Sequence, residues 1–427
     1  MSPEEIRVPA DAGLRRSLAR LDGAGETGGS GEPEIDRGRA DELLARVAWS
    51  RLAEPGDGLA GELLRALGAT RMLGLLVSGA GAKRIREIAA AAGASEIGTR
   101  QLGAGLERWL PRLDRAASVS DVQRGVAAGM RVLLPGDPGW PSFLERLGEH
   151  APTLLWFRGD AALLSAPSLA VVGARASTGY GAHVTAEITD GVCAAGVTIV
   201  SGGAYGIDAV AHRTALAASA STIAVLAGGL DRPYPVAHTS LLGRIADRGL
   251  LCSEMVPGSA PTRWRFLQRN RIIAALSSTT LVAEAGVRSG SLNTAGHAAE
   301  MGIPLGAIPG PITSASSSGC HRLIREYGAA LVTGTEDVLE LLRSAGGVPP
   351  GELDGGGESS REPALHRRVI DALPLRGARS CSEVARLAGV SPDEARGALA
   401  ELELLGSVER RETPGAAESK WSLVRRE

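Results

Sequence analysis

With 427 residues, the chain is too long for a single ordinary hydrophobic core and suits two or three domains. Aromatic residues make up only 3% of the chain and its net charge is −2, which excludes both a long series of stacking rings and a global positive field for nucleic acid. Any binding of nucleic acid would therefore depend on local arginines and backbone amides.

The four cysteines lie far apart without a CxxC pair, and the seven histidines include no HExxH motif. This pattern predicts neither a metal site nor a disulfide framework, and it favours a reducing cytoplasm. No apolar run approaches the ~18 residues of a membrane span, and the N-terminal residues lack the features of a signal peptide. We therefore expect a cytoplasmic protein with no membrane partner.

The N-terminal third of the chain changes character near residue 37. Residues 1–37 are rich in Gly, Glu and Pro and predict a mostly disordered leader. In residues 38–117, apolar residues recur at helical spacing with glycines between the blocks, which predicts a small domain of short helices. Such a bundle could bind DNA or protein, but plain packing explains the pattern better.

Residues 118–345 alternate strand and helix signals. Strand-like runs at 132–134 and 154–157 flank a turn that carries Trp140 and form the edge of this domain. Further strands are predicted at residues 169–172, 198–200, 223–227, 250–253, 280–283, 305–308 and 330–332. Their continuous apolar character predicts an α/β fold with a doubly wound, mostly parallel sheet that helices cover on both faces.

The C-terminal part begins after a stretch with linker composition, residues 346–362. Residues 363–427 then show three helical patterns and a last stretch, 407–424, with a Pro-Gly break, which together predict a winged helix. Its expected recognition helix carries four acids against Arg396 alone, so phosphate repulsion argues against ordinary major-groove docking. A protein contact or accessory role therefore suits this domain better than transcriptional regulation.

The strongest functional signal lies in residues 168–212, where two apolar runs each break into a glycine turn and then a helical pattern. This arrangement places backbone amides at an anion. The first turn lacks GxGxxG, and no acid that could hold a ribose follows the second strand, so NAD and FAD are disfavoured and no cofactor is expected. Arg175 could instead grip a phosphate, although a surface ion pair explains it about as well.

The turn at residues 201–208 offers two adjacent glycines that let the backbone approach a ligand. Asp208 begins the next helix, and we expect it to cap that helix or hold the loop rather than act as a base, because no nucleophile is evident beside it. Residues 262–271 contain four arginines and no acid. The segment 289–291, Ser-Gly-Ser, opens another helix with free amides.

Taken in order, these segments resemble the DNA-processing protein A family (DprA, also called Smf). The matching segments are VVGAR (171–175), SGGAYGID (201–208), RNRIIAALS (269–277), EAGVRSGSLNTA (284–295), AIPG (307–310) and GCHRLIREYGAALV (319–332). The resemblance implies a SAM-like domain at 38–117, an extended Rossmann-like domain at 118–345 and a C-terminal winged helix. It further implies a homodimer that binds single-stranded DNA and loads the RecA recombinase onto it during natural transformation, without being an enzyme.

Carried onto this chain, the resemblance implies a phosphate contact at Arg175 within a larger DNA site. The implied DNA-binding residues are Gly173, Arg175, Ser201, Gly202, Gly203, Tyr205, Gly206, Arg269, Asn270, Arg271, Ser289, Gly290, Ser291 and Thr294. The implied dimer edge contains His321, Ile324 and Leu331. Many relatives have a basic residue where this chain has Tyr205, which either removes a phosphate contact or supplies a stacking ring.

A nucleotide-processing enzyme is the alternative, because related Rossmann-like folds hydrolyse nucleoside monophosphates at comparable glycine loops, as phosphoribohydrolases do. Such an enzyme needs a positioned acid or base. Only Glu284 and Asp208 are expected near the pocket, and neither has an evident partner in the sequence. The sequence therefore favours a non-enzymatic binding protein.

Overall fold

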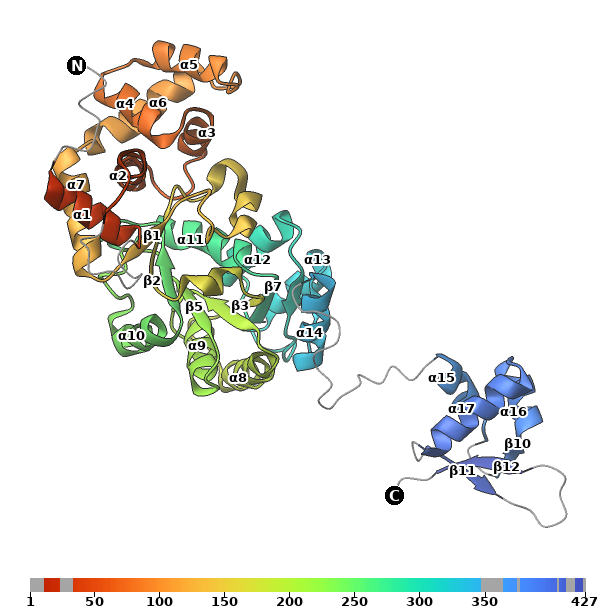
Figure 1. The fold of residues 1–427 in the computed structure, drawn as a ribbon. Helices are drawn as coiled ribbons and strands as arrows, with labels where there is room; N and C mark the ends of the chain where they lie inside the picture. Colours follow the sequence, from red (N-terminus) through yellow and green to blue (C-terminus); the bar gives the residue numbers. More distant parts are fainter. Residues whose placement is uncertain are drawn as a thin grey trace. The chain divides into compact units, whose positions relative to one another are not determined.

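The computed structural model describes residues 11–23, 34–346, 364–374, 377–404, 407–411 and 419–424. The chain divides into two compact units, Met1–Glu352 and Leu353–Glu427 (Figure 1). Within the described ranges, no helix combines the length and the apolar character needed to cross a bilayer.

The first unit is built on a nine-stranded sheet. Its strands are β1 (Arg131–Leu133), β2 (Leu155–Gly159), β3 (Ser168–Gly173), β4 (Thr198–Ser201), β5 (Thr222–Val225), β6 (Leu250–Ser253), β7 (Thr279–Glu284), β8 (Leu305–Ala307) and β9 (Ala330–Leu331). Their order is β1-β2-β6-β5-β4-β3-β7-β8-β9. Strands β3 to β9 pair in parallel, whereas β2 runs antiparallel to both β1 and β6. The predicted α/β fold class with a mostly parallel sheet is confirmed.

The connections create a switch point beside β3. The chain steps outward from β3 through β4 and β5 to β6, and then returns to β7 on the other side of β3. Helices that leave β3 and β7 therefore diverge to opposite faces, and the crevice between them opens at the carboxyl ends of these strands. Ligands of open α/β sheets bind at such a point.

Both faces of the sheet are covered, because the central strands are apolar throughout and successive side chains point to opposite faces. One face carries α8 (Gly179–Ala194), α9 (Ile207–Ala217), α10 (Thr239–Arg248) and α14 (Thr335–Ser344). The other face carries α11 (Arg263–Ala275), α12 (Ser291–Glu300) and α13 (Ser318–Glu326). The sheet is thus doubly wound.

Five helices form a module with its own core before the sheet begins. They are α2 (Arg37–Leu52), α3 (Gly58–Leu67), α4 (Ala69–Val77), α5 (Ala82–Ala91) and α6 (Thr99–Trp109). The rings of Trp49 and Trp109 meet edge to face in this core, 5.3 Å apart. Helix α7 (Arg115–Ala127) then returns toward the sheet and packs on α2. Short 3₁₀ turns lie at η2 (Leu110–Arg112), η3 (Ser142–His150), η4 (Ala161–Ser165) and η5 (Val236–His238).

Helix α1 (Ala12–Leu21) corrects one prediction, because it lies inside the segment 1–37 that we expected to be disordered. Leu14, Leu18 and Leu21 line one face of this helix and are buried in the core that α7 and α2 share. The average composition of the segment concealed this short amphipathic stretch. Residues 1–10 and 24–33 of the expected leader lie outside the described residues, as do residues 347–362 of the expected linker.

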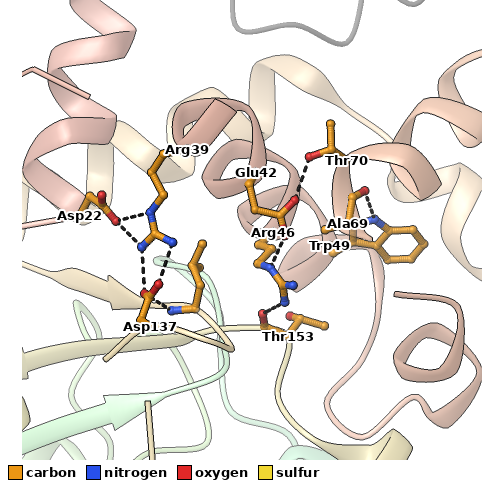
Figure 2. Close-up of polar contacts among 10 residues, drawn as sticks. Asp22, Arg39, Glu42, Arg46, Trp49, Ala69, Thr70, Asp137 and Thr153 are labelled. Carbon is orange, nitrogen blue, oxygen red and sulfur yellow. Dashed lines mark hydrogen bonds and ion pairs between the residues drawn. The ribbon is translucent and has the colours of Figure 1, made fainter. Parts of the chain in front are cut away.

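Arg39 on α2 joins the helical module to the sheet (Figure 2). Its guanidinium donates to Asp22 at the end of α1, with Nε 2.9 Å away, and to both oxygens of Asp137, at 2.7 and 2.8 Å. Asp137 lies in the turn after β1, where it also accepts from the backbone of Leu134 at 2.8 Å. The hydrogen bonds to Asp137 and Asp22 raise the pKa of Arg39. An ion pair that stays charged therefore connects the helical module to the sheet.

In the described residues of the second unit, three helices pack with a small antiparallel sheet. The elements are α15 (Ala364–Asp371), β10 (Arg379–Ser380), α16 (Cys381–Ala388), α17 (Pro392–Leu404), β11 (Val408–Arg411) and β12 (Lys420–Leu423), with strand order β10-β12-β11. Val384, Leu399 and Trp421 are buried together in its core. This arrangement is compatible with the expected winged helix, and α17 is the helix whose acidic face we noted in the sequence.

Candidate functional site

A pocket of about 870 Å³ opens at the switch point. Its walls come from the turn after β3, the first residues of α9, the inner side of α11 and the loop that leads into α12. Four arginines line it, Arg175, Arg263, Arg269 and Arg288, against a single acid, Asp208. The site therefore suits an anionic ligand.

The loop at residues 202–206 is held rigidly at the edge of this pocket. Gly203 and Gly206 have φ of 67° and 73°, which side chains disfavour, and a Cβ at Gly206 would collide with the backbone carbonyl of Ala174. The carboxylate of Asp208 accepts from the backbone of Gly202 at 3.2 Å and of Ala204 at 3.3 Å. Burial raises the pKa of Asp208, while Arg269 opposes that shift. Asp208 thus holds the loop, which agrees with the structural role expected for it.

Arg269 supplies a fixed positive charge at the base of the site. Its Nη1 donates to the carbonyl oxygens of Gly202 and Val225, each at 2.7 Å, and so ties together the ends of β4 and β5. Burial lowers the pKa of Arg269 to about 10 and Asp208 opposes that shift, so the side chain remains charged at neutral pH. The guanidinium lies 5.9 Å from the ring of Phe266.

Arg175 presents a positive charge to the ligand side of the pocket. Its side chain is exposed, and its guanidinium carbon lies 5.0 Å from the centre of the Phe266 ring. Among the described residues, no carboxylate pairs with Arg175 and no hydrogen-bond acceptor meets it. The surface ion pair that competed with the phosphate contact is therefore not formed within the described part of the chain.

The opposite wall of the pocket is the start of helix α12. The amides expected to be free at this helix start have local acceptors, since the Leu292 amide donates to the carbonyl of Ser289 at 3.2 Å and the Asn293 amide to that of Gly290 at 3.1 Å. The hydroxyls of Ser289 and Ser291 lie 2.7 Å apart beside them, and the Ser289 hydroxyl accepts from the Ser291 amide at 3.4 Å. Asn270 holds this wall by donating to the carbonyl of Gly290 at 3.3 Å and to the side chain of Asn293 at 3.2 Å. The two hydroxyls and the partial positive charge of the helix start make this wall a favourable environment for phosphate oxygens.

Comparison with known proteins identifies the family. The family model described as DNA recombination-mediator protein A matches residues 131–343. A DNA processing protein DprA of Mycobacterium tuberculosis (strain H37Rv) is 42% identical over 325 residues, which cover 73% of this chain and 81% of that protein. The chain belongs to the DNA-processing protein A family. Its general role is therefore DNA processing.

Further members of the DNA-processing protein A family agree with this assignment. DprA of Streptococcus pneumoniae (strain R6) is 47% identical over 189 residues, which cover 44% of this chain and 66% of that protein. The X-ray structure of DprA from Streptococcus pneumoniae matches with a TM-score of 0.57 and 35% identity, and the match covers 70% of this chain and 96% of the other. The similarity to the family thus extends well beyond residues 171–332, the part of the chain that carries the sequence motifs.

Eight of the fourteen residues that the family resemblance implied for DNA binding line the pocket together. They are Gly173, Arg175, Arg269, Asn270, Ser289, Gly290, Ser291 and Thr294. Gly202 lies behind this wall, where it lines a smaller pocket with Arg269. Gly203 and Gly206 shape the loop through their backbone conformation. The motifs of the DNA-processing protein A family therefore converge on one site even though they come from four separate segments.

Three implied residues have other surroundings in this DNA-processing protein A family member. Arg271 donates to both carboxylate oxygens of Glu254, at 2.7 and 2.6 Å, in a buried pair. The hydroxyl of Ser201 is buried and donates to the carbonyl of Val171 at 2.7 Å. Tyr205 is 47% exposed outside the pocket lining. Helix geometry could have separated Arg271 from the pocket, because residues two apart on a helix point in nearly opposite directions.

Among the lining residues that were not predicted from the sequence are Arg288, Phe266 and Tyr234. Phe266 precedes Arg269 by three positions, so helical spacing could have placed both on one face of α11. Arg288 lies within a quoted motif, next to Ser289. Tyr234 comes from the loop between β5 and η5, and no local pattern predicts its position.

The residues implied for a dimer edge of the DNA-processing protein A family lie on α13 and β9. Leu331 is 52% exposed on β9, which ends the sheet. Ile324 is half-buried against the core, and the ring of His321 lies 2.9 Å from the carbonyl of Gly310. These three residues thus cluster near one edge of the sheet, remote in sequence from the pocket loops.

Proposed function

We propose that the pocket binds the backbone of single-stranded DNA and that the protein performs no catalysis there. The observation that carries this proposal is Arg175, whose guanidinium is exposed above Phe266 without a carboxylate partner in the described residues. An arginine in this setting can meet a phosphate with its edge while a ring supports its face. Arg269 adds a second positive charge beneath it.

A single strand suits this site better than a duplex. Phosphate contacts alone do not distinguish the two, but the pocket also contains the ring of Phe266, and an unpaired base has a free face to place against a ring. In a duplex the bases are stacked and paired, so their faces cannot reach a pocket wall. The combination of arginines and an aromatic ring therefore supports a preference for single strands.

The candidate catalytic groups are engaged in holding the backbone. Glu284 is buried and accepts from the backbone amide of Thr178 at 2.8 Å, which fixes the start of α8. Asp208 accepts from two loop amides. Burial lowers the pKa of His212 to about 3, so its ring is neutral, and Nδ1 lies 2.7 Å from the hydroxyl of Thr222. Glu284 and His212 do not line the pocket, and Asp208 is the one of the three that does while it also holds the loop, which supports a binding function over nucleotide hydrolysis.

Binding of oligonucleotides by Arg175→Ala tests the proposal. We expect weaker binding to single strands of any sequence, with the slope of log K against log salt reduced by about 0.7 for one lost phosphate contact. Arg248→Ala is the matched control. Arg248 is exposed at the end of α10 and precedes β6, so it lies at the amino ends of the parallel strands, whereas the pocket lies at their carboxyl ends. Unchanged binding by Arg175→Ala would refute the site. Release of free base from nucleoside monophosphates, abolished by Glu284→Gln, would replace the proposal with hydrolysis.

We also propose a cytoplasmic homodimer that protects single strands and loads RecA onto them. The family resemblance is the basis, and the exposed Leu331 on edge strand β9 supports a dimer edge there. Light scattering on Leu331→Asp should give half the mass of the parent protein if this edge forms the dimer. A pull-down of RecA with and without single-stranded DNA tests the second partner, and failure to retain RecA in either condition would refute loading.

A further inference from the structure

Exposed aromatic rings gather beside the pocket. In the described part of the chain, the exposed aromatic residues are Tyr180, Tyr205, Tyr234, Trp264 and Tyr327. Two of them are connected by one short segment, 234–238: Tyr234 begins this segment and packs on Phe266 of the pocket, and Tyr205 packs on His238 at its end. In a chain with only 3% aromatic residues, two exposed rings beside one short segment call for a reason other than core packing.

Tyr234 extends the aromatic wall of the pocket outward. Its ring centre lies 5.5 Å from that of Phe266, with the planes tilted by 52°, and the side chain is 47% exposed. Phe266 in turn has the guanidinium of Arg175 near it. Tyr234 lines both the main pocket and the smaller one beside it. The ring of Tyr234 therefore lies between the proposed phosphate contact at Arg175 and the open surface.

Tyr205 is supported from below by a histidine. The rings of Tyr205 and His238 meet edge to face at 4.7 Å, and His238 is buried with Nδ1 3.0 Å from the carbonyl of Gly203. This support fixes the Tyr205 ring on the rigid glycine loop while 47% of the side chain stays exposed. A ring that is held on one side and open on the other is suited to receive a flat ligand.

A strip of side chains along this segment connects the two rings. Tyr234 lies two positions before the 3₁₀ turn η5, which His238 ends, and Val236 is 77% exposed. The strip runs from Phe266 in the pocket to Tyr234, along the segment past Val236 to His238, and from His238 to Tyr205. No described carboxylate forms an ion pair with a residue of this strip.

We propose that this strip is a stacking track for the bases of the strand as it leaves the pocket, with one base on Tyr234 and one on Tyr205. The inference rests on the proposed binding of single-stranded DNA and adds where the bases outside the pocket lie. Stacking on an aromatic ring tolerates every base, because each has a flat π face. The track would therefore strengthen binding without adding sequence preference, and without adding phosphate contacts.

Oligothymidylates of increasing length, measured by fluorescence anisotropy with the full chain, test the track. For strands long enough to leave the pocket, Tyr205→Ala and Tyr234→Ala should each weaken binding by roughly 5- to 150-fold, the range for one lost base stack. The salt slope should stay unchanged, and Tyr→Phe at either position should restore the affinity. Leu110→Ala is the control, since it removes an apolar side chain of similar exposure, 45%, from the helical module.

The outcomes separate the track from the pocket. Arg175→Ala should weaken strands of every length and flatten the salt slope, whereas Tyr205→Ala, which lies outside the pocket lining, should affect only the longer strands. If the tyrosine variants bind long strands like the parent protein, or if Tyr→Phe loses as much as Tyr→Ala, the track is refuted. If Arg175→Ala has no effect while the tyrosine variants do, the pocket assignment fails and the track stands. Equal melting temperatures of parent and variants exclude misfolding as the cause.

Discussion

The contact between Gly202 and Arg269 leads to a steric prediction. A Cβ on Gly202 would lie 2.5 Å from the guanidinium carbon of Arg269, about 1 Å closer than ordinary van der Waals contact allows. The guanidinium cannot withdraw freely, because it is buried and Nη1 donates to two carbonyls at 2.7 Å. A displacement of about 1 Å stretches both bonds beyond hydrogen-bond range. With ~1.5–3 kcal/mol for each bond to a charged donor, Gly202→Ala should lower the free energy of unfolding by about 3–6 kcal/mol.

Urea unfolding of the first unit, followed by circular dichroism, measures this loss. Gly202 does not have a positive φ, so backbone strain does not contribute to the expected effect. The matched control is Gly243→Ala on helix α10, where a Cβ meets nothing within 4 Å. That change should stabilise the protein by up to ~1 kcal/mol through helix propensity. A Gly202→Ala variant whose stability lies within about 0.5 kcal/mol of the parent would refute the idea that Arg269 is locked against this loop.

Three further changes probe the buried charge, the buried histidine and the N-terminal helix. Arg271→Met leaves Glu254 buried without its partner and should cost about 3–5 kcal/mol in urea unfolding; a loss below 1 kcal/mol would contradict the buried pair. Burial lowers the pKa of His212 to about 3, whereas the unfolded side chain titrates at ~6.5, so between these pH values the unfolded state binds one more proton. The free energy of unfolding should therefore decrease as the pH is lowered through this window, by up to ~1.4 kcal/mol per pH unit. The free energy of unfolding of His212→Asn should decrease less steeply in that window, and a slope equal to that of the parent protein would refute a buried, neutral His212. Leu18→Ala should cost ~2–5 kcal/mol because Leu18 is fully buried, whereas exposed Arg20→Ala should change stability by under ~0.5 kcal/mol; equal effects would mean that α1 does not dock.

Strand positions were predictable because the sheet is buried on both faces. Runs such as 169–172 and 250–253 contain only apolar or small residues, and each corresponds to an observed strand within one or two residues. The edge ribbon of β1 and β2 was also visible, since apolar runs flank a Pro- and Gly-rich turn. Strand order, however, was not predicted, since local pattern does not state which strands pair.

The helix α1 and the joint at Arg39 were not predictable in the same way. Leu14, Leu18 and Leu21 repeat at helical spacing, but a ten-residue helix beside a Gly- and Glu-rich stretch is marginal alone and forms here because it packs on α7. Arg39 meets Asp137, which is 98 positions away, and no local signal links two such residues. Contacts of this kind are set by the assembled core.

The residues of the site divide in the same manner. Arg175 and Ser289 follow strand ends, and parallel strands bring their carboxyl ends to one edge, so their convergence was predictable. Arg271 was assigned by motif alone, and the motif does not say which way a side chain points. Tyr234 reaches the pocket only because of the path of its loop, which sequence periodicity does not describe.

The rigidity of the glycine loop has a consequence for the kinetics of binding. The carboxylate of Asp208 and the guanidinium of Arg269 hold the loop from both sides before any ligand arrives. No segment of this loop has to be ordered during association, so the entropic cost of binding is small there. We therefore expect a fast association rate that is set by electrostatic encounter and falls with salt, whereas changes to the aromatic side chains should act mainly on the rate at which the strand dissociates.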